Sequence, residues 1–425
     1  MTAQQPSLIR QQIRQALMAF ATGAASGVFT AVMLGLISGA GERLWGETTE
    51  QGLIPSIPLL WSVAVCGSVG VLLAVIERGD ERNLLPELPE TMQDLRDPEN
   101  APERHELRSV LAAALAQIGG GPVGPEALLT RLITIASQWI WRGRDQQLAD
   151  AAVAGSLGLF EAPLLGGVVV NQHRLNLQSR WIPGTVGGLA GFAVFGGILE
   201  VTGGSMARVP YIWPSTLRED LGSVAVGLLT GLVGGAVGIA LRQWRGALQR
   251  RQLLAHWRWW PVLTGVLLGV LLHWFPMVGF AGEHQVIPLL DGANRDTIAL
   301  LLSIGVLKLL MMGLCLETGW RGGIFFPGFV VACAFGASLH LLLPQLGSIG
   351  SWCAGVTGGF FMLMLGRPLV VLVLTVCLMQ GHGATSALLS VGVASLISRW
   401  LHGGDDAPPP PPETPDSPEY PAPQA

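Results

Sequence analysis

Charged side chains are scarce in this sequence of 425 residues: 13% are Asp, Glu, Lys or Arg, whereas 50% are hydrophobic. A soluble domain usually carries about 25% charged residues. This composition therefore argues against soluble, disordered and nucleic-acid-binding proteins. Lysine is almost absent, because Lys308 is the only one. The apolar character extends from about residue 16 to about residue 400, which predicts one multi-pass protein embedded in a lipid bilayer.

Signatures of catalysis and of metal or disulfide chemistry are also missing. The five cysteines lie in apolar stretches without a CxxC pair, so we expect buried thiols rather than disulfides or metal ligands. The sequence contains no nucleophile–base pair, phosphate-binding loop or zinc motif. We therefore expect neither an enzyme nor a cofactor. The polar N-terminus and a long first apolar run do not fit a cleavable signal peptide.

Glycine and arginine are what the chain has instead. The 57 glycines suit close packing of membrane helices, and several apolar segments are broken by Gly and Pro. Arginines cluster within 10–14, 78–108 and 242–258, which the positive-inside rule places in the cytoplasm with both termini. We expect a cytoplasmic N-terminus (1–15), a membrane domain (16–404) of two inverted repeats (about 16–202 and 221–404), and a disordered Pro-rich tail (405–425).

Two Gly/Pro-rich interruptions indicate where a ligand could bind. Gly121 precedes Pro163 by 42 positions (163 − 121), and Gly323 precedes Pro368 by 45 (368 − 323). A broken segment followed at similar distance by a new helix, twice, is the pattern of a transporter repeat. Breaks expose helix N-termini, whose N–H groups and positive dipole ends favour a small anion. The alternative is that these glycines only permit close packing.

The same residues resemble motifs of the ClC chloride channel and transporter family. Residues 322–327 resemble its GxFxP anion-site motif, and residues 121–125 its GxEGP motif. Residues 160–166 and 367–369 resemble two further helices of that family. The resemblance implies an all-α membrane protein of tilted and broken helices, a homodimer with one anion pore in each subunit. It also implies that the N–H groups of Ile324 and Phe325, beside Gly323, bind the anion, and that Val123 and Gly124 add an outer part.

The departures from the family pattern bear on mechanism. Val123 stands where the family has its gating glutamate, and valine can neither carry a proton nor mimic chloride. Glu126 lies three residues later and is either a substitute gate or a structural residue. The family's inner proton-transfer position falls near His173, with Gln172 beside it. A histidine there could carry a proton, but an ordinary histidine at the membrane edge is the simpler interpretation.

Two further positions complete the predicted site. Asn83 aligns with the serine of the family's GSGIP motif, where its amide could donate to an anion or cap a helix. No residue replaces the family's pore tyrosine, since Tyr420 lies in the tail. Glu317 and Arg321 flank the second break, as an ion pair or as anion-steering groups.

These departures favour passive conduction of small inorganic anions, chloride foremost, over coupled exchange. A proton/chloride antiporter using Glu126 or His173 is the first alternative. A membrane scaffold or sensor that conducts nothing is the second.

Overall fold

The structure is a computed structural model. It describes residues 5–46, 57–76, 106–141, 146–160, 162, 164–171, 181–202, 211–214, 222–250, 258–282 and 284–401. Within these ranges the regular structure is helical and no strand is assigned. The α-helices are α1 (Gln5–Trp45), α2 (Leu59–Ile76), α4 (Glu106–Ile118), α5 (Glu126–Trp141), α6 (Gln146–Ser156), α7 (Leu165–Asn171), α8 (Trp181–Thr202), α10 (Val224–Arg250), α12 (Trp260–Trp274), α13 (Val286–Asp291), α14 (Ile298–Glu317), α15 (Phe325–Leu342), α16 (Ile349–Leu365), α17 (Pro368–Leu378) and α18 (Ala384–Leu401).

The helices have the lengths and composition of a multi-pass membrane protein. Seven of those described are long and apolar enough to cross a bilayer, namely α1, α2, α8, α10, α14, α15 and α18. Helix α1 has 41 residues, about twice the ~20 that a perpendicular span needs, so it must tilt or extend beyond the membrane. Several others, among them α6, α16 and α17, are shorter apolar helices. The predicted mixture of spanning and broken helices is confirmed.

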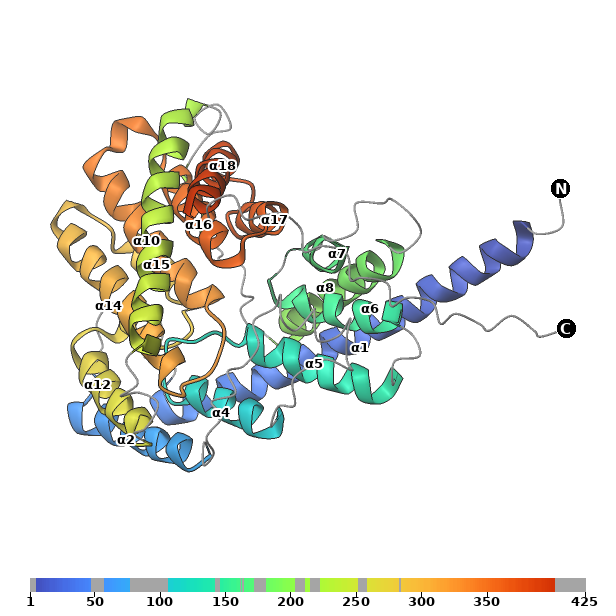
Figure 1. The fold of residues 1–425 in the computed structure, drawn as a ribbon, viewed down its shortest axis with the longest axis horizontal. Coiled ribbons are helices and arrows are strands. Elements are labelled where there is room, and N and C mark those ends of the chain that lie inside the picture. Colours follow the sequence, from blue (N-terminus) through green and yellow to red (C-terminus); the bar gives the residue numbers. More distant parts are fainter. Residues whose placement is uncertain are drawn as a thin grey trace, which may run out of the picture.

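The two halves of the chain repeat the same packing. In the first half, α1, α6 and α8 pack against one another, and in the second half α10, α16 and α18 do the same. The two groups form separate lobes, which Figure 1 shows in blue to green and in yellow-green to red. Helix α2 of the first half packs on α12 of the second, so the halves also exchange contacts. Each half thus contains one group of three mutually packed helices.

Glycine permits the closest helix contacts, as the composition suggested. Gly191 of α8 faces Gly155 of α6, and a Cβ atom on Gly191 would overlap the main chain of Gly155. A larger residue at this crossing would force the helices apart, because a packed interior resists added volume.

Each half contains one break, which is a short non-helical segment between two consecutive helices. The first runs from Gly119 to Pro125, between α4 and α5, and has seven residues (125 − 118). The second runs from Thr318 to Ile324, between α14 and α15, and also has seven (324 − 317). The breaks place the start of α5 and the start of α15 at corresponding points of the two halves.

Candidate anion site

The two breaks meet through their main chains. Gly124 N–H donates to Gly323 O at 2.7 Å, and Gly323 N–H donates to Gly124 O at 2.8 Å. Each glycine lies two positions before the first residue of its helix, Glu126 for α5 and Phe325 for α15. By its distance from the start of its helix, Gly323 therefore corresponds to Gly124. The sequence comparison had instead set Gly323 against Gly121, three positions earlier than Gly124.

The carboxylate of Glu126 crosses this junction to the other half. Its Oε1 accepts a hydrogen bond from Phe325 N–H at 2.6 Å. The side chain is buried, and among the described residues nothing hydrogen-bonds its second oxygen, Oε2. A negative oxygen at a helix N-terminus is stabilised by the unpaired N–H groups and the helix dipole. The carboxylate thus occupies the place that the sequence predicts for an anion.

Both bridging glycines make room for this carboxylate. A Cβ atom on Gly124 or on Gly323 would overlap the carboxylate atoms of Glu126. Neither position needs a left-handed backbone, since positive φ values within the two breaks occur at Gly120 and Gly319. The requirement for glycine at 124 and 323 is therefore the close approach of the Glu126 side chain.

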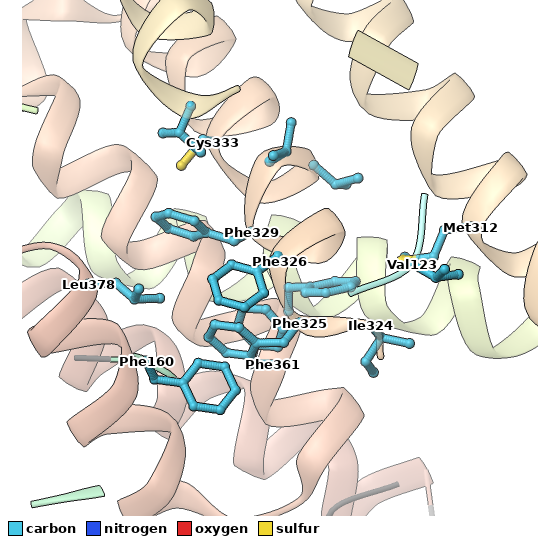
Figure 2. Close-up of a cluster of buried hydrophobic side chains, with 14 of the residues drawn as sticks. Val123, Phe160, Met312, Ile324, Phe325, Phe326, Phe329, Cys333, Phe361 and Leu378 are labelled. Atoms are coloured by element: carbon cyan, nitrogen blue, oxygen red, sulfur yellow. The ribbon is translucent and has the colours of Figure 1, made fainter. Parts of the chain in front are cut away.

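A cavity adjoins the carboxylate. Its volume is about 120 Å³, and its wall includes Glu126, Ile324, Phe325 and the rings of Phe160 and Phe361. The Phe325 ring stacks on Phe361 at 4.6 Å and meets Phe160 edge-on at 4.6 Å. Figure 2 shows these rings gathered at the start of α15. Aromatic rings beside the carboxylate lower the local dielectric constant, which strengthens electrostatic interactions there.

A second, more open cavity of about 360 Å³ continues from the first. Arg245, Ile324 and Leu365 line both cavities, and Arg242 and Ser398 line the open one. Arg245 Nε donates to Glu317 Oε1 at 2.7 Å, so the carboxylate beside the second break pairs with an arginine of α10. The recorded partner of Glu317 is thus Arg245, not the Arg321 that the sequence suggested. Arg242 and Arg245, one turn apart on α10, bring two guanidinium groups to the wall of the open cavity.

The predicted anion ligands divide into two groups. Phe325 N–H holds the Glu126 carboxylate, and Ile324 is the N-cap of α15 beside it. The other N–H groups already have acceptors: Val123 donates to Gly121 O at 2.8 Å, while Gly124 and Gly323 donate to each other. Among these groups, Phe325 N–H is thus the one that contacts a carboxylate, whereas those of Val123, Gly124 and Gly323 bond to main-chain oxygens. The position beside Phe325 N–H is called the seat below.

Val123 itself is fully buried and does not leave an opening. A Cβ atom on Gly322 would approach Val123 Cβ to 2.7 Å, so the two residues pack closely. Figure 2 shows Val123 beside Met312 of α14, away from the Phe160 and Phe361 rings. Asn83, Gln172 and His173 lie outside the described residues.

Most of the chain is similar to proteins of one known family. The profile of the family described as "Voltage gated chloride channel" matches residues 84–402, which is most of the chain. The chain belongs to this family. Relatives include the H(+)/Cl(-) exchange transporters ClcA of Yersinia pestis bv. Antiqua (strain Angola), 27% identical, and of Vibrio campbellii, 24% identical. The two alignments cover 61% of this chain, and 56% and 57% of those proteins, so they span little more than half of each relative.

Solved structures of chloride-channel-family proteins share the fold. A slow cyanobacterial Cl-/H+ antiporter superposes with a TM-score of 0.68 at 17% identity, over 92% of this chain and 95% of that one. A CLC-type fluoride/proton antiporter gives 0.66 at 16% identity, over 91% and 95%. At such identities the likeness establishes the fold. The family's fold and an integral multi-pass membrane location are therefore established for this chain.

Proposed function

We propose that this protein transports small inorganic anions, chloride foremost, in exchange for protons, and that Glu126 is its gate. The observation that carries the proposal is the hydrogen bond from Phe325 N–H to Glu126 Oε1 at 2.6 Å. It favours the alternative of a coupled exchanger over the passive conduction that Val123 suggested. The gate lies three residues beyond the position at which the family motif has it.

Charge competition supplies the mechanism. A carboxylate and a chloride ion cannot share one seat, because two negative charges a few ångströms apart repel strongly in a medium of low dielectric constant. While Glu126 is charged, its Oε1 fills the seat at Phe325. Protonation removes that charge and weakens the hold of the N–H group and the helix dipole. The neutral side chain then leaves, an anion enters, and the departing carboxyl group carries its proton.

Release of the anion needs a seat without full positive charge. The hydrogen bond recorded to the seated carboxylate comes from a main-chain N–H group. Such a group binds an anion firmly enough to admit it and weakly enough to release it. Arg245 lines the cavity that adjoins the seat, and the Glu317 carboxylate partly neutralises its positive charge. We place this arginine end on the cytoplasmic side, because the basic segment 242–258 follows the positive-inside rule.

Reconstituted liposomes test the mechanism. In the wild type, a chloride gradient is expected to drive protons uphill, whereas Glu126→Gln should abolish proton movement and leave anion flux. Glu200→Gln is the matched control, since it removes the same charge from an exposed position on α8. Anion flux without proton movement in the wild type would restore passive conduction. No anion flux from folded protein would favour a scaffold or sensor.

We also propose that the protein is a homodimer, as the family resemblance implies. Light scattering of the detergent-purified protein should give twice the mass of 44.9 kDa after subtraction of the detergent. A monomer that still transports anions would contradict the dimer and leave the Glu126 mechanism intact.

A further inference from the structure

Lys308 is a buried cation that the proposed mechanism does not use. It lies within α14 and is fully buried. Its ammonium nitrogen is 3.0 Å from Met277 O, 2.7 Å from Gly279 O, 3.0 Å from Phe280 O and 2.9 Å from Gln285 Oε1. A charged side chain inside a membrane is costly, and such residues usually serve function.

The ammonium fixes an irregular segment between α12 and α13. Gln285 Nε2 also donates to Gly279 O at 3.1 Å, so side chains from two elements hold the same carbonyl group. Phe280 adopts a positive φ of 60°. A phenylalanine keeps this unusual conformation only where surrounding contacts hold it. The contacts of Lys308 with Gly279 O and Phe280 O are of this kind.

This segment in turn holds the first break of the anion site. Phe280 N–H donates to Gly120 O at 2.8 Å. The indole of Trp45 meets the Phe280 ring edge-on at 5.4 Å, and its Nε1 donates to Ile118 O at 2.8 Å. The end of α4 and the start of the break are thus fixed from outside. Six positions after Gly120 the chain reaches Glu126.

We propose that Lys308 is a positioning residue for the anion site. Its ammonium orients the main chain of residues 277–280, and Phe280 passes that orientation to Gly120 and so to the segment that places Glu126. The ammonium also contacts three main-chain carbonyl oxygens near the break, and a polar group buried without a hydrogen-bond partner is costly. Its effect on transport rests on the function proposed above, whereas its effect on the geometry of the break does not.

Three variants test the role. Lys308→Met keeps the aliphatic stem and removes the donors. Gln285→Met is milder, because it removes one acceptor of the ammonium and one donor to Gly279 O. Thr357→Val is the control, since it deletes a buried hydrogen bond within α16, from Thr357 Oγ1 to Cys353 O at 2.7 Å. Each variant is measured for thermal stability, for chloride KM and maximum rate in liposomes, and for hydrogen exchange of the main-chain amides of residues 118–121, 123 and 124.

Lys308→Met is expected to raise chloride KM and the exchange rates of these amides by roughly tenfold, as loss of a hydrogen bond to a charged group implies. Gln285→Met should raise chloride KM and the exchange rates by a smaller factor. If Lys308→Met does not fold, the result for Gln285→Met tests the proposal. Thr357→Val should change neither chloride KM nor the exchange rates of these amides, even where it lowers the thermal stability. Wild-type exchange and KM in Lys308→Met, or equal shifts in the control, would overturn the proposal. If the wild type moves no anion, the proposed function fails, and hydrogen exchange alone decides whether Lys308 holds the break.

Discussion

The two breaks have the same length and opposite chemistry. The helix after the first break, α5, begins with Glu126, whose carboxylate accepts a hydrogen bond. The helix after the second break, α15, begins with Phe325, whose N–H group donates it. Their glycines, Gly124 and Gly323, bond reciprocally across the interface between the halves. The comparison teaches that a repeated backbone can form one site when each copy contributes a different group. Four predictions test this division, from the largest expected effect to the smallest.

The largest effect is expected from substituting the bridging glycines. A Cβ atom at Gly323 or at Gly124 would overlap the Glu126 carboxylate, although the two glycines belong to different halves. Gly323→Val and Gly124→Val should each lower transport by about 100-fold or more, as expected where a shift near 1 Å misplaces a site. Anion flux in liposomes measures this, with Gly392→Val on α18, where a Cβ meets nothing within 4 Å, as control. Near-normal flux in either variant would show that transport does not depend on the Gly124–Gly323 bridge.

The second prediction concerns the carboxylate that the family motif has at position 123. Val123→Glu should not create a gate, because Val123 is buried against Gly322 and away from the seat. A carboxyl group there would be buried without a designed partner and should destabilise the fold by about 3 kcal/mol. Thermal unfolding measures the loss, with Val123→Met, similar in size to glutamate but uncharged, as the control for added volume. A stable Val123→Glu protein with pH-dependent flux that survives Glu126→Gln would show that position 123 still controls the path.

The third prediction addresses the open cavity, to which the second half contributes an arginine. Arg245→Gln removes a positive charge that lines both cavities and the ion pair with Glu317. Anion flux at low ionic strength should fall by about tenfold, and the deficit should shrink at high salt, because salt screens the steering charge. Flux measured at two ionic strengths checks this, with Arg250→Gln, exposed on the same helix, as control. A deficit that is independent of salt would assign Arg245 a purely structural role.

The smallest effect is expected at the aromatic wall. Phe361 stacks on Phe325 at 4.6 Å and lines the cavity beside Glu126. Phe361→Leu should cost about 1 kcal/mol of stability and raise anion flux a few-fold, since it removes ring contacts and widens the cavity. Unfolding and flux are measured on the same preparation. Reduced flux at unchanged stability would mean that the ring guides the anion instead of restricting it.

Sequence reasoning located the breaks but could not decide the role of Glu126. Gly and Pro at residues 119–125 and 319–327 mark the interruptions, because these residues end helices. Whether Glu126 faces the seat depends on the register between the halves, which the Gly124–Gly323 bridge sets across 199 positions (323 − 124). No local pattern encodes that register. The ion pair of Glu317 with Arg245, 72 positions away, escaped prediction for the same reason, whereas Arg321 was only the nearer charge in sequence.

The oxygen atoms that surround the Lys308 ammonium could not be predicted from the sequence either. The sequence shows a single lysine in an apolar helix, and nothing in it names the main-chain oxygens that surround the ammonium. Those acceptors come from an irregular segment 28 to 31 positions earlier, and backbone oxygens have no sequence signature.

The central claim is that the Glu126 carboxylate fills the anion seat at Phe325. Bromide, located by its anomalous scattering in crystals of wild-type and Glu126→Ala protein grown at one bromide concentration and neutral pH, tests it most directly. We predict bromide beside Phe325 N–H in Glu126→Ala and the carboxylate there in the wild type. Bromide at Phe325 in the wild type with Glu126 turned away, or an empty seat in Glu126→Ala, would contradict the account.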